Sequence, residues 1–507
     1  MREYALEVHG LYKYFGPVKA NDGVTLSVLN GTIHAIVGEN GAGKTTFVRC
    51  LFGHQRPDRG EIRLWGKPVQ FSSPQEALAN GIGMVHQHFM LVDALSVWEN
   101  IVLGAEQGKG GWLSIPACKR AVEKISSDFK LDVDLGVAIG DLSVGIQQRV
   151  EILKVLYRGA RLVILDEPTA VLTPQESRQL FEVLRGLREK GCTIILITHK
   201  LAEVLNVADD VTVMRDGRSI GTWPVSDVTE KMLAHEMVGH DVVLEVTKEP
   251  LACGNPIVEI ERLSVESAQG DQGLQDTSLV IHAGEILGVA GVAGNGQDAL
   301  VEGILGLRRI THGNVRLFGR EIVGMSTRQI RALGVACIPA DRLRMGLVSD
   351  LSVRENVLLG FEHQEAMRRG PVLNDGAVTE RARHVVHEFN VKTSSLDIPV
   401  VHLSGGNQQK LIIGRELDNG PRFLVAVQPT RGVDIGAIKF IDEVLLTCRR
   451  NHDAVLLVSN ELEEILSLAD TIMVLFRGQP IGFGPVAMFS RDDIGLMMAG
   501  HVPEDVP

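Results

Sequence analysis

The sequence predicts an α/β protein made of two homologous domains, each built around a mainly parallel sheet. Two glycine-rich segments, 38–45 and 291–298, each follow a short apolar run and precede a helical pattern. The runs at 33–37, 162–165 and 194–197 are continuously apolar rather than alternating. Continuous runs are typical of strands buried on both faces of a parallel sheet, with the site at their carboxyl ends.

Composition and charge exclude several classes of protein. The chain has 507 residues, of which 45% are hydrophobic and 22% charged, as in ordinary globular domains. A net charge of −12 argues against an extended nucleic-acid interface. Six scattered cysteines, without a Cys-x-x-Cys pattern, argue against a zinc site and favour a reducing cytoplasm. We expect neither a signal peptide nor a membrane span of about 18 apolar residues, so any membrane role would come through partners.

The register of the repeat can be followed along the chain. Gly38 matches Gly291 at an offset of 253 residues, whereas Leu142 matches Leu403 at an offset of 261. The second copy therefore gains eight residues between these points. We expect domain 1 at residues 1–240, a linker at 241–255, domain 2 at 256–501 and a tail at 502–507.

The first glycine-rich segment has every group of a phosphate-binding loop. Glycines let backbone amides turn toward phosphate, and the helix that follows adds its positive end. We expect Lys44 to reach the β- and γ-phosphates and Thr45 to offer its hydroxyl to Mg²⁺. The expected nucleotide-binding residues here are Gly38, Glu39, Asn40, Gly41, Ala42, Gly43, Lys44, Thr45 and Thr46.

The apolar run at 162–165 ends in two acidic residues. Asp166 is placed to hold Mg²⁺, and Glu167 to orient or deprotonate an attacking water. Acids commonly cap strands, so this pair is weak evidence alone. The intact phosphate loop upstream makes the catalytic interpretation the better one.

Between the loop and the acidic pair lies a third motif, Leu-Ser-Val-Gly-Ile-Gln-Gln at 142–148. Gln87 precedes it, and His199 follows the next apolar run. Motifs of these kinds in this order resemble the ATP-binding domains of ABC transporters, and the resemblance covers nearly the whole chain. It implies two tandem P-loop ABC ATPase domains, each with a mainly parallel core sheet, an antiparallel β subdomain and a helical signature subdomain.

The resemblance also implies roles for single residues. Gln87 matches the Q-loop glutamine, residues 170–173 the D-loop, and His199 the switch histidine that faces the γ-phosphate. Phe15, or its neighbour Tyr14, matches the aromatic residue that stacks on adenine. The expected cofactors are ATP and Mg²⁺, with a catalytic set of Lys44, Gln87, Glu167 and His199 and a metal-binding set of Thr45, Gln87 and Asp166.

The second copy keeps the glycines of the repeat but not its reactive side chains. Residues 261–280 also contain no aromatic residue for an adenine shelf. These differences predict that fast hydrolysis is confined to the first site. The replacements in the second copy are Gln297 for Lys44, Asp298 for Thr45, Ala340 for Gln87, Val427 for Asp166, Gln428 for Glu167 and Asn460 for His199.

The two signature motifs show the opposite asymmetry. The second, Leu-Ser-Gly-Gly-Asn-Gln-Gln at 403–409, is close to the family consensus, whereas the first has Val144 and Ile146 at two of its positions. In the family, two domains pair head to tail, and each site joins one phosphate loop to the signature of the other domain. The resemblance thus implies one composite site, which Asp434 of the second D-loop would join and Thr173 would not. The second domain would contribute Ser404, Gly405, Gly406 and Asn407 to it.

Tandem domains with a degenerate second site resemble the ATP-binding subunits of bacterial importers for simple sugars and nucleosides. Segments 84–92, 166–176 and 428–434 look like the nucleoside branch, and the sugar branch typically keeps a basic residue where this chain has Gln297. Ala340 departs from the acid usual in the nucleoside branch. The sequence therefore favours an importer ATPase for nucleosides, and a sugar importer ATPase is the alternative.

Importers of this kind imply partners. The resemblance implies two integral membrane permease subunits, an extracytoplasmic substrate-binding lipoprotein, no nucleic acid, and a place on the cytoplasmic face of the cell membrane. Residues 87–135 would grip a permease, and Phe89, Met90 and Trp98 are either part of that contact or local core. A soluble translation or DNA-repair member of the family is a third possibility, disfavoured by the short linker and the lack of zinc cysteines.

Overall fold

The computed structural model divides the chain into two compact units, residues 1–244 and 245–507. Among the described residues, no helix has the length and apolar character needed to cross a bilayer. The description covers residues 3–16, 18–86, 89–109, 112–169, 172–239, 248–268, 272–292 and 294–502.

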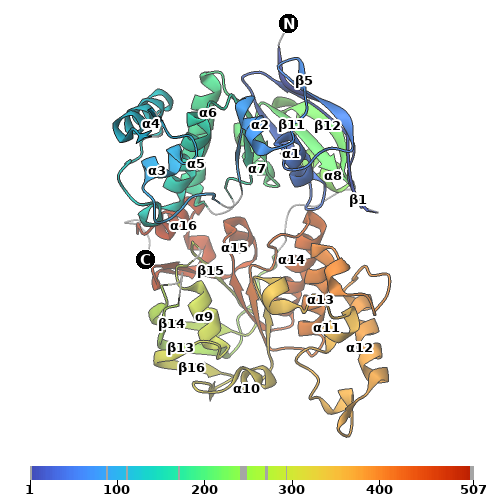
Figure 1. The fold of residues 1–507 in the computed structure, drawn as a ribbon. Helices are drawn as coiled ribbons and strands as arrows, with labels where there is room; N and C mark the ends of the chain where they lie inside the picture. Colours follow the sequence, from blue (N-terminus) through green and yellow to red (C-terminus); the bar gives the residue numbers. More distant parts are fainter. Residues whose placement is uncertain are drawn as a thin grey trace. The chain divides into compact units, whose positions relative to one another are not determined.

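Each unit has a part rich in strands and a separate group of helices (Figure 1). The first unit contains β1 (Tyr4–Phe15), β2 (Val18–Leu29), β3 (Ile33–Val37), α1 (Lys44–Leu51), β4 (Arg59–Leu64), β5 (Lys67–Val69), α2 (Pro74–Ala79), β6 (Ile82–Val85), α3 (Val97–Val102), β7 (Gly108–Lys109), β8 (Trp112–Leu113), α4 (Ile115–Phe129), α5 (Val144–Tyr157), β9 (Leu162–Asp166), α6 (Pro174–Glu189), β10 (Thr193–Ile197), α7 (Leu201–Val207), β11 (Asp210–Arg215), β12 (Arg218–Pro224) and α8 (Glu230–Val238).

The second unit repeats this order. It contains β13 (Pro256–Val265), β14 (Leu274–His282), β15 (Ile286–Ala290), α9 (Gln297–Ile304), β16 (Ile310–Leu317), β17 (Arg320–Glu321), α10 (Thr327–Ala332), β18 (Val335–Ile338), a π-helix (Arg342–Gly346), α11 (Val353–Leu358), β19 (Arg368–Arg369), β20 (Val372–Leu373), α12 (Asp375–Glu388), α13 (Gly405–Leu417), β21 (Phe423–Val427), α14 (Ile435–Arg450), β22 (Ala454–Val458), α15 (Leu462–Leu468), β23 (Thr471–Phe476), β24 (Gln479–Pro485) and α16 (Arg491–Met498).

The sheets confirm the predicted fold class. In the first unit, β11, β3, β10, β9 and β6 are parallel neighbours, and β12 closes one edge in the antiparallel sense. The second unit has the same arrangement in β18-β21-β22-β15-β23-β24. Each unit also has a four-stranded antiparallel sheet, β2-β1-β4-β5 or β14-β13-β16-β17.

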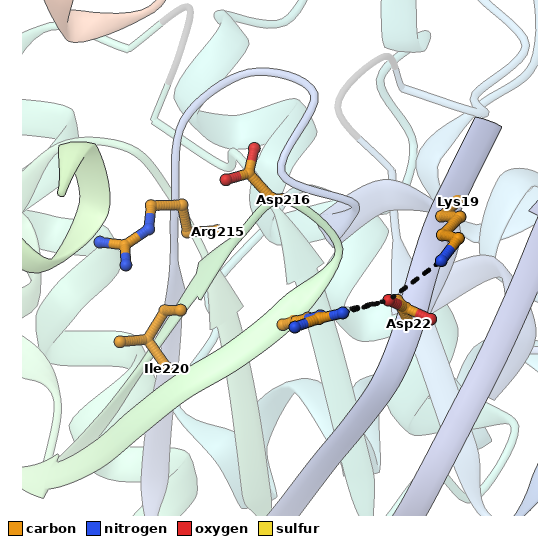
Figure 2. A pocket seen from close by; sticks show the side chains of 6 residues that line it. Lys19, Asp22, Arg215, Asp216 and Ile220 are labelled. Atoms are coloured by element: carbon orange, nitrogen blue, oxygen red, sulfur yellow. Dashed lines mark hydrogen bonds and ion pairs between the residues drawn. The ribbon is translucent and has the colours of Figure 1, made fainter.

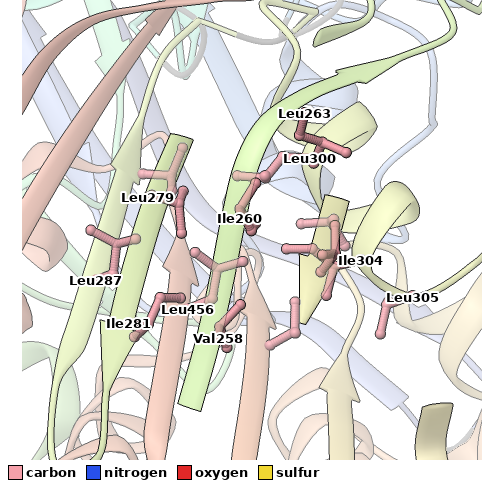
Figure 3. Close-up of a cluster of buried hydrophobic side chains, with 14 of the residues drawn as sticks. Val258, Ile260, Leu263, Leu279, Ile281, Leu287, Leu300, Ile304, Leu305 and Leu456 are labelled. Atoms are coloured by element: carbon pink, nitrogen blue, oxygen red, sulfur yellow. The ribbon is translucent and has the colours of Figure 1, made fainter. Parts of the chain in front are cut away.

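The core explains why the central strands carry continuous apolar runs. Every residue of β3, β9 and β10 is buried, because the sheet has covered surfaces on both faces. In the second unit, Figure 3 shows Ile260 of β13, Leu300 and Ile304 of α9, and Leu287 and Leu456 of the parallel sheet in one cluster. The helix α9, which follows the glycine-rich loop, therefore packs against both the antiparallel and the parallel sheet. This packing fixes the position of the loop.

The helical groups are also built alike. Both α3 and α11 begin with a capping box, in which a serine and a glutamate exchange hydrogen bonds across the first turn. Inside each group lies one buried asparagine, Asn100 or Asn356. Its side-chain oxygen accepts a hydrogen bond from a backbone N–H of the preceding loop, and its side-chain nitrogen donates to backbone carbonyls there. The same polar device thus holds the loop that approaches each helical group.

Part of the predicted linker belongs structurally to the second unit. Arg449 donates a hydrogen bond to the carbonyl of Glu249 at 2.9 Å, and Gly254 donates to Ala283 at 2.8 Å. Lys248 forms an ion pair with Asp470 at 3.4 Å. Residues 241–247 of the predicted linker lie outside the described residues.

His34 makes the stability of the first unit depend on pH. It is buried in β3, where Nε2 lies 2.8 Å from the Thr212 hydroxyl, and burial lowers its pKa from 6.5 to about 4. Below pH 6.5 the unfolded chain takes up a proton that the folded chain does not accept until about pH 4. Stability is therefore lost as pH falls through this window.

We predict that His34→Leu flattens this dependence, since the second unit has Leu287 at the equivalent position. Between pH 6.5 and 4.5, the first unit of the wild type should lose about 2 kcal/mol more unfolding free energy than the variant. Urea denaturation at a series of pH values measures the difference. Changing the exposed His9 to Leu is the control and should leave the wild-type slope; equal slopes for wild type and His34→Leu would contradict the prediction.

Candidate functional site

The first glycine-rich loop joins β3 to α1 and is tightly packed at its two ends. A Cβ on Gly38 would lie 2.3 Å from the Met214 carbonyl oxygen, and one on Gly43 would lie 2.2 Å from that of Ala20. Gly43 also has a φ of 97°, in the left-handed region that favours glycine. Glycine is therefore required at both positions, and the chain turns directly into the first turn of α1.

Lys44 is buried and folds back over this loop. Its Nζ donates to the carbonyl oxygens of Gly38 at 2.6 Å and Glu39 at 3.0 Å. Burial lowers the pKa of Lys44, and the nearby charges of Glu167 and Asp166 oppose that effect. The loop, the lysine and the acidic pair thus share one electrostatic environment.

The register of three parallel strands brings these groups together. Ile197 of β10 lies opposite Ile36 of β3 on one side and Asp166 of β9 on the other. The phosphate loop, His199 and Glu167 therefore leave the sheet at one edge, immediately after the ends of neighbouring strands. This edge is where α/β folds place their ligands.

Glu167 and His199 form a direct contact at that edge. His199 Nδ1 lies 2.9 Å from Glu167 Oε1. Burial acts to raise the pKa of Glu167, but the hydrogen bond and charge of His199, with Lys44, outweigh it and leave the pKa lowered. Burial and then the charge of Glu167 raise the pKa of Asp166 to about 6. The pKa values of these two adjacent acids are thus shifted in opposite directions.

The two aromatic candidates for base stacking differ in their surroundings. The hydroxyl of Tyr14 donates to Asp22 Oδ1 at 2.7 Å, and its backbone N–H donates to Asp58. Phe15 is 45% exposed, and Lys13 Nζ lies 5.6 Å from the centre of its ring. Tyr14 is also exposed, at 38%, so the two rings differ mainly in the hydrogen bond that ties the Tyr14 hydroxyl to Asp22.

A charged surface pocket lies next to the hairpin that contacts the glycine-rich loop 38–45. Figure 2 shows Asp22 pointing toward Lys19 and toward an arginine of the β11–β12 hairpin, which is Arg218 at 2.7 Å. The turn of that hairpin bonds to the loop, because Gly217 N–H donates to Ala42. Asp22 pairs with both Lys19 and Arg218, and Arg215 donates to the Glu236 carbonyl, so we assign the pocket a supporting role. The pocket is lined by Lys19, Asp22, Arg215, Asp216, Arg218 and Ile220.

Gln87 lies outside the described residues, so its position stays a prediction. The chain on either side is described: β6 ends at Val85, and the Met90 carbonyl accepts a hydrogen bond from Lys154 at 2.6 Å. Met90 is 61% exposed, but Trp98 is buried in the core of the helical group. Of the two alternatives for Trp98, a permease contact or local core, the structure therefore supports local core, because α3 turns this side chain inward.

The two signature segments differ in the side chains that bond to the first turn of the following helix, α5 in the first unit and α13 in the second. Ser404 caps α13, and Asn407 Nδ2 donates to its Oγ at 2.8 Å. Ser143 precedes α5 without a side-chain capping bond. In the first unit the Gly145 N–H donates to Glu176 Oε1 at 3.2 Å, so a carboxylate occupies the start of that helix.

Glu176 was missed by sequence reasoning. Its Oε2 also closes a capping box with Thr173 at the start of α6, and that local Thr-x-x-Glu spacing was a visible signal for the cap only. The position equivalent to Glu176 in the second unit is Ala437. Asp434 caps α14 there by accepting from the Ala437 N–H at 2.7 Å.

The second glycine-rich loop keeps its shape without its charge. Gly296 has a φ of 101°, and the buried Gln297 donates to the Val292 carbonyl at 3.1 Å, much as Lys44 donates to its own loop. Val427 is buried at the end of β21, and Gln428 follows it with a φ of 47°, as Glu167 does in the first unit. At these described positions the backbone conformation is retained, whereas the chemistry of the side chains differs.

The fold and this site define a P-loop nucleoside triphosphatase with a duplicated domain. The chain belongs to the ABC transporter family, whose profile matches residues 21–170 and 274–431. This membership confirms the predicted resemblance and makes the chain an ATP-binding ABC ATPase.

Relatives match over nearly their full length. The guanosine import ATP-binding protein NupO of Bacillus subtilis is 44% identical over 99% of both chains. The nucleoside import ATP-binding protein NupA of Lactococcus lactis is 42% identical over 98% of both. The glucose import ATP-binding protein TsgD13 of Haloferax volcanii is 41% identical over 98% of this chain and 96% of its own.

Proposed function

We propose that this chain is the ATP-hydrolysing subunit of an ABC importer for nucleosides, with one active composite site. The observation that carries the catalytic part is the Lys44, Asp166, Glu167 and His199 cluster at one sheet edge. Similarity of 44% and 42% to guanosine and nucleoside import proteins supports the substrate class. The 41% identity to a glucose import protein keeps a sugar importer as the second candidate.

In this proposal Glu167 orients and deprotonates the attacking water. Its lowered pKa keeps the carboxylate ionised near neutral pH, and the contact with His199 fixes its direction. His199 and Lys44 face the γ-phosphate, where the Lys44 charge and a hydrogen bond from His199 stabilise the developing negative charge. Phe15 stacks on the adenine, since Tyr14 is bound to Asp22.

Mg²⁺ would be held by oxygen donors at the same edge. Asp166 supplies a buried carboxylate and Thr45 an exposed hydroxyl at the start of α1, and these hard donors fit the ion. The pKa of Asp166, raised by burial to about 6, indicates a carboxylate that lacks full charge compensation from the protein. The Gln87 amide is the third proposed ligand. A bound Mg²⁺ would neutralise phosphate charge.

The composite site is proposed to join loop 38–45 to the tip of α13. The Ser404 hydroxyl and the amides of Gly405 and Gly406 start a helix whose positive end suits phosphate. The equivalent tip in the first unit already has the Glu176 carboxylate bonded to Gly145, which would repel phosphate. The damaged loop and the acid-blocked tip would share the second, inactive site.

Electrostatics indicates why the second loop would not hydrolyse ATP quickly. A lysine about 4 Å from a phosphate charge contributes on the order of 4 kcal/mol at an effective dielectric constant of about 20. Losing it at Gln297 would slow the reaction roughly a thousandfold. Val427 has no oxygen to bind a metal, and the family's general base is absent at Gln428.

The proposal includes membrane partners. Two integral permease subunits and an extracytoplasmic substrate-binding lipoprotein would complete the transporter, and would hold this chain on the cytoplasmic face of the membrane. Exposed apolar side chains after the Q-loop positions support a contact there, with Met90 61% and Met345 61% exposed.

We predict that Glu167→Gln lowers the kcat for ATP about a hundredfold or more while ATP still binds, because the base is lost and the loop is intact. Gln428→Asn, the matched change in the second unit, should alter kcat less than about twofold. Steady-state phosphate release and equilibrium nucleotide binding measure both. Comparable losses from the two variants would refute the asymmetry.

A second prediction concerns the signature pairing. Ser404→Arg should reduce turnover by about a hundredfold, since it fills the phosphate-facing tip of α13, whereas Ser143→Arg should have a milder effect. The two variants carry the same change at equivalent positions, and thermal unfolding shows whether each is folded. The reverse order of activity would disprove the pairing.

The substrate class is tested with the reconstituted transporter. In proteoliposomes with its permeases and binding protein, guanosine should stimulate ATP hydrolysis several-fold, whereas ribose and galactose should not. Stimulation by a sugar alone would replace the nucleoside proposal with the sugar alternative and leave the catalytic part standing.

A further inference from the structure

Arg342 connects three elements of the second unit through three separate donors. Its Nε donates to Gln408 Oε1 at 3.2 Å, its Nη1 to the Arg431 carbonyl at 3.0 Å, and its Nη2 to the Gly432 carbonyl at 3.2 Å. Gln408 lies in the first turn of α13, just after the signature serine. Arg431 and Gly432 form the turn that leads to α14. One side chain therefore joins the loop after β18, the signature helix and the D-loop turn.

The loop that carries Arg342 lies along α13. A Cβ on Gly346 would lie 2.6 Å from Ile412 Cδ1, and Arg415 Nη1 donates to the Gly346 carbonyl at 2.8 Å. Positions 408, 412 and 415 lie on one face of a helix. The π-helix Arg342–Gly346 is thus fastened to α13 at both ends, and displacing it must also displace α13.

The Arg342 guanidinium, called the fork below, also lies close to the backbone of Gly405 in the signature segment. Its Nη2 lies 2.7 Å from the place where a Cβ on residue 405 would be. A side chain at Gly405 would have to push the guanidinium away from Gly432. The position of the Arg342 guanidinium therefore requires a residue without a side chain at Gly405, directly after Ser404.

The first unit has no counterpart of this arginine. Its Lys154–Met90 bond corresponds to Arg415–Gly346, so the two loops can be aligned at these carbonyls. Four residues, 86–89, precede the carbonyl in the first unit, and seven, 339–345, in the second. The sequence His-Gln-His-Phe at 86–89 contains no arginine. The fork is thus restricted to the copy that keeps the consensus signature.

The same loop presents apolar side chains to the surface. Leu343 is 47% exposed and Met345 is 61% exposed, on either side of the exposed Arg344. A partner that grips these side chains would pull on a loop fastened to α13. The exposed side chains and the fork thus lie on one short, continuous segment.

We propose that Arg342 is a positioning residue that transmits movement of loop 339–347 to Ser404 and the D-loop turn. The inference rests on the proposed composite site, since it assigns Ser404 to the active phosphate. Arginine suits this role because its planar fork holds several donors in fixed directions, whereas lysine has one flexible ammonium. The signature helix and the turn before Asp434 then move together.

The first experiment uses the isolated full-length chain and hydrogen exchange of its peptides. Arg342→Ala should speed amide exchange in peptides 403–410 and 430–436 by about tenfold, because both segments lose a shared partner. Arg344→Ala removes an equal charge from the same turn and is the matched control; it should leave both peptides unchanged. Unchanged exchange in Arg342→Ala would overturn the proposed link.

The second experiment measures turnover in the reconstituted transporter. Arg342→Ala should lower the substrate-stimulated kcat about tenfold, with the KM for ATP changed less than about twofold, because nucleotide contacts remain. Arg342→Lys should not restore the rate. Full stimulation in Arg342→Ala or full rescue by lysine would each overturn the proposal. If Ser404→Arg instead keeps its turnover, the composite site fails, while the exchange result still reports the link itself.

Discussion

The alignment of three neighbouring parallel strands is the constraint on which the rest of the molecule depends. Because Ile197 lies between Ile36 and Asp166 in the sheet, the segments that follow these strands must leave at the same edge. A lysine, a histidine and two acids that are far apart in the sequence then meet at that edge, where the contact between His199 and Glu167 can form. Packing of the apolar strand residues therefore also determines the geometry of the site.

The second unit shows that this constraint works without the chemistry. Val427 pairs with Val458 in the same register that joins Asp166 to Ile197, and Gln428 has the same left-handed φ of 47° as Glu167. The fold depends on residues inside the sheet, whereas reactivity depends on side chains just beyond it. The two sets can change separately, which allows a duplicated domain to keep its shape while the side chains beyond the sheet change.

Features that depend on local pattern could be predicted from the sequence, and features that depend on packing could not. Continuous apolar runs and glycine positions were sufficient for the fold and for the place of Lys44. The contact of Glu176 with Gly145 and the fork of Arg342 join segments that meet only after the helices pack, and no local pattern encodes them. The sequence left Trp98 open between surface and core for a related reason, since a six-residue helix is too short for its periodicity to show which face is buried.

Replacing the strand-end aspartate by Val427 in the second unit also removes a cost to its stability. Burial raises the pKa of Asp166 to about 6, which means that the folded first unit disfavours the ionised carboxylate near neutral pH. Val427 occupies the equivalent strand end as a buried apolar residue, for which burial is favourable. Stability of the fold and the presence of a carboxylate therefore make opposite demands at this strand end. The duplicated chain has the carboxylate in one copy and an apolar residue in the other.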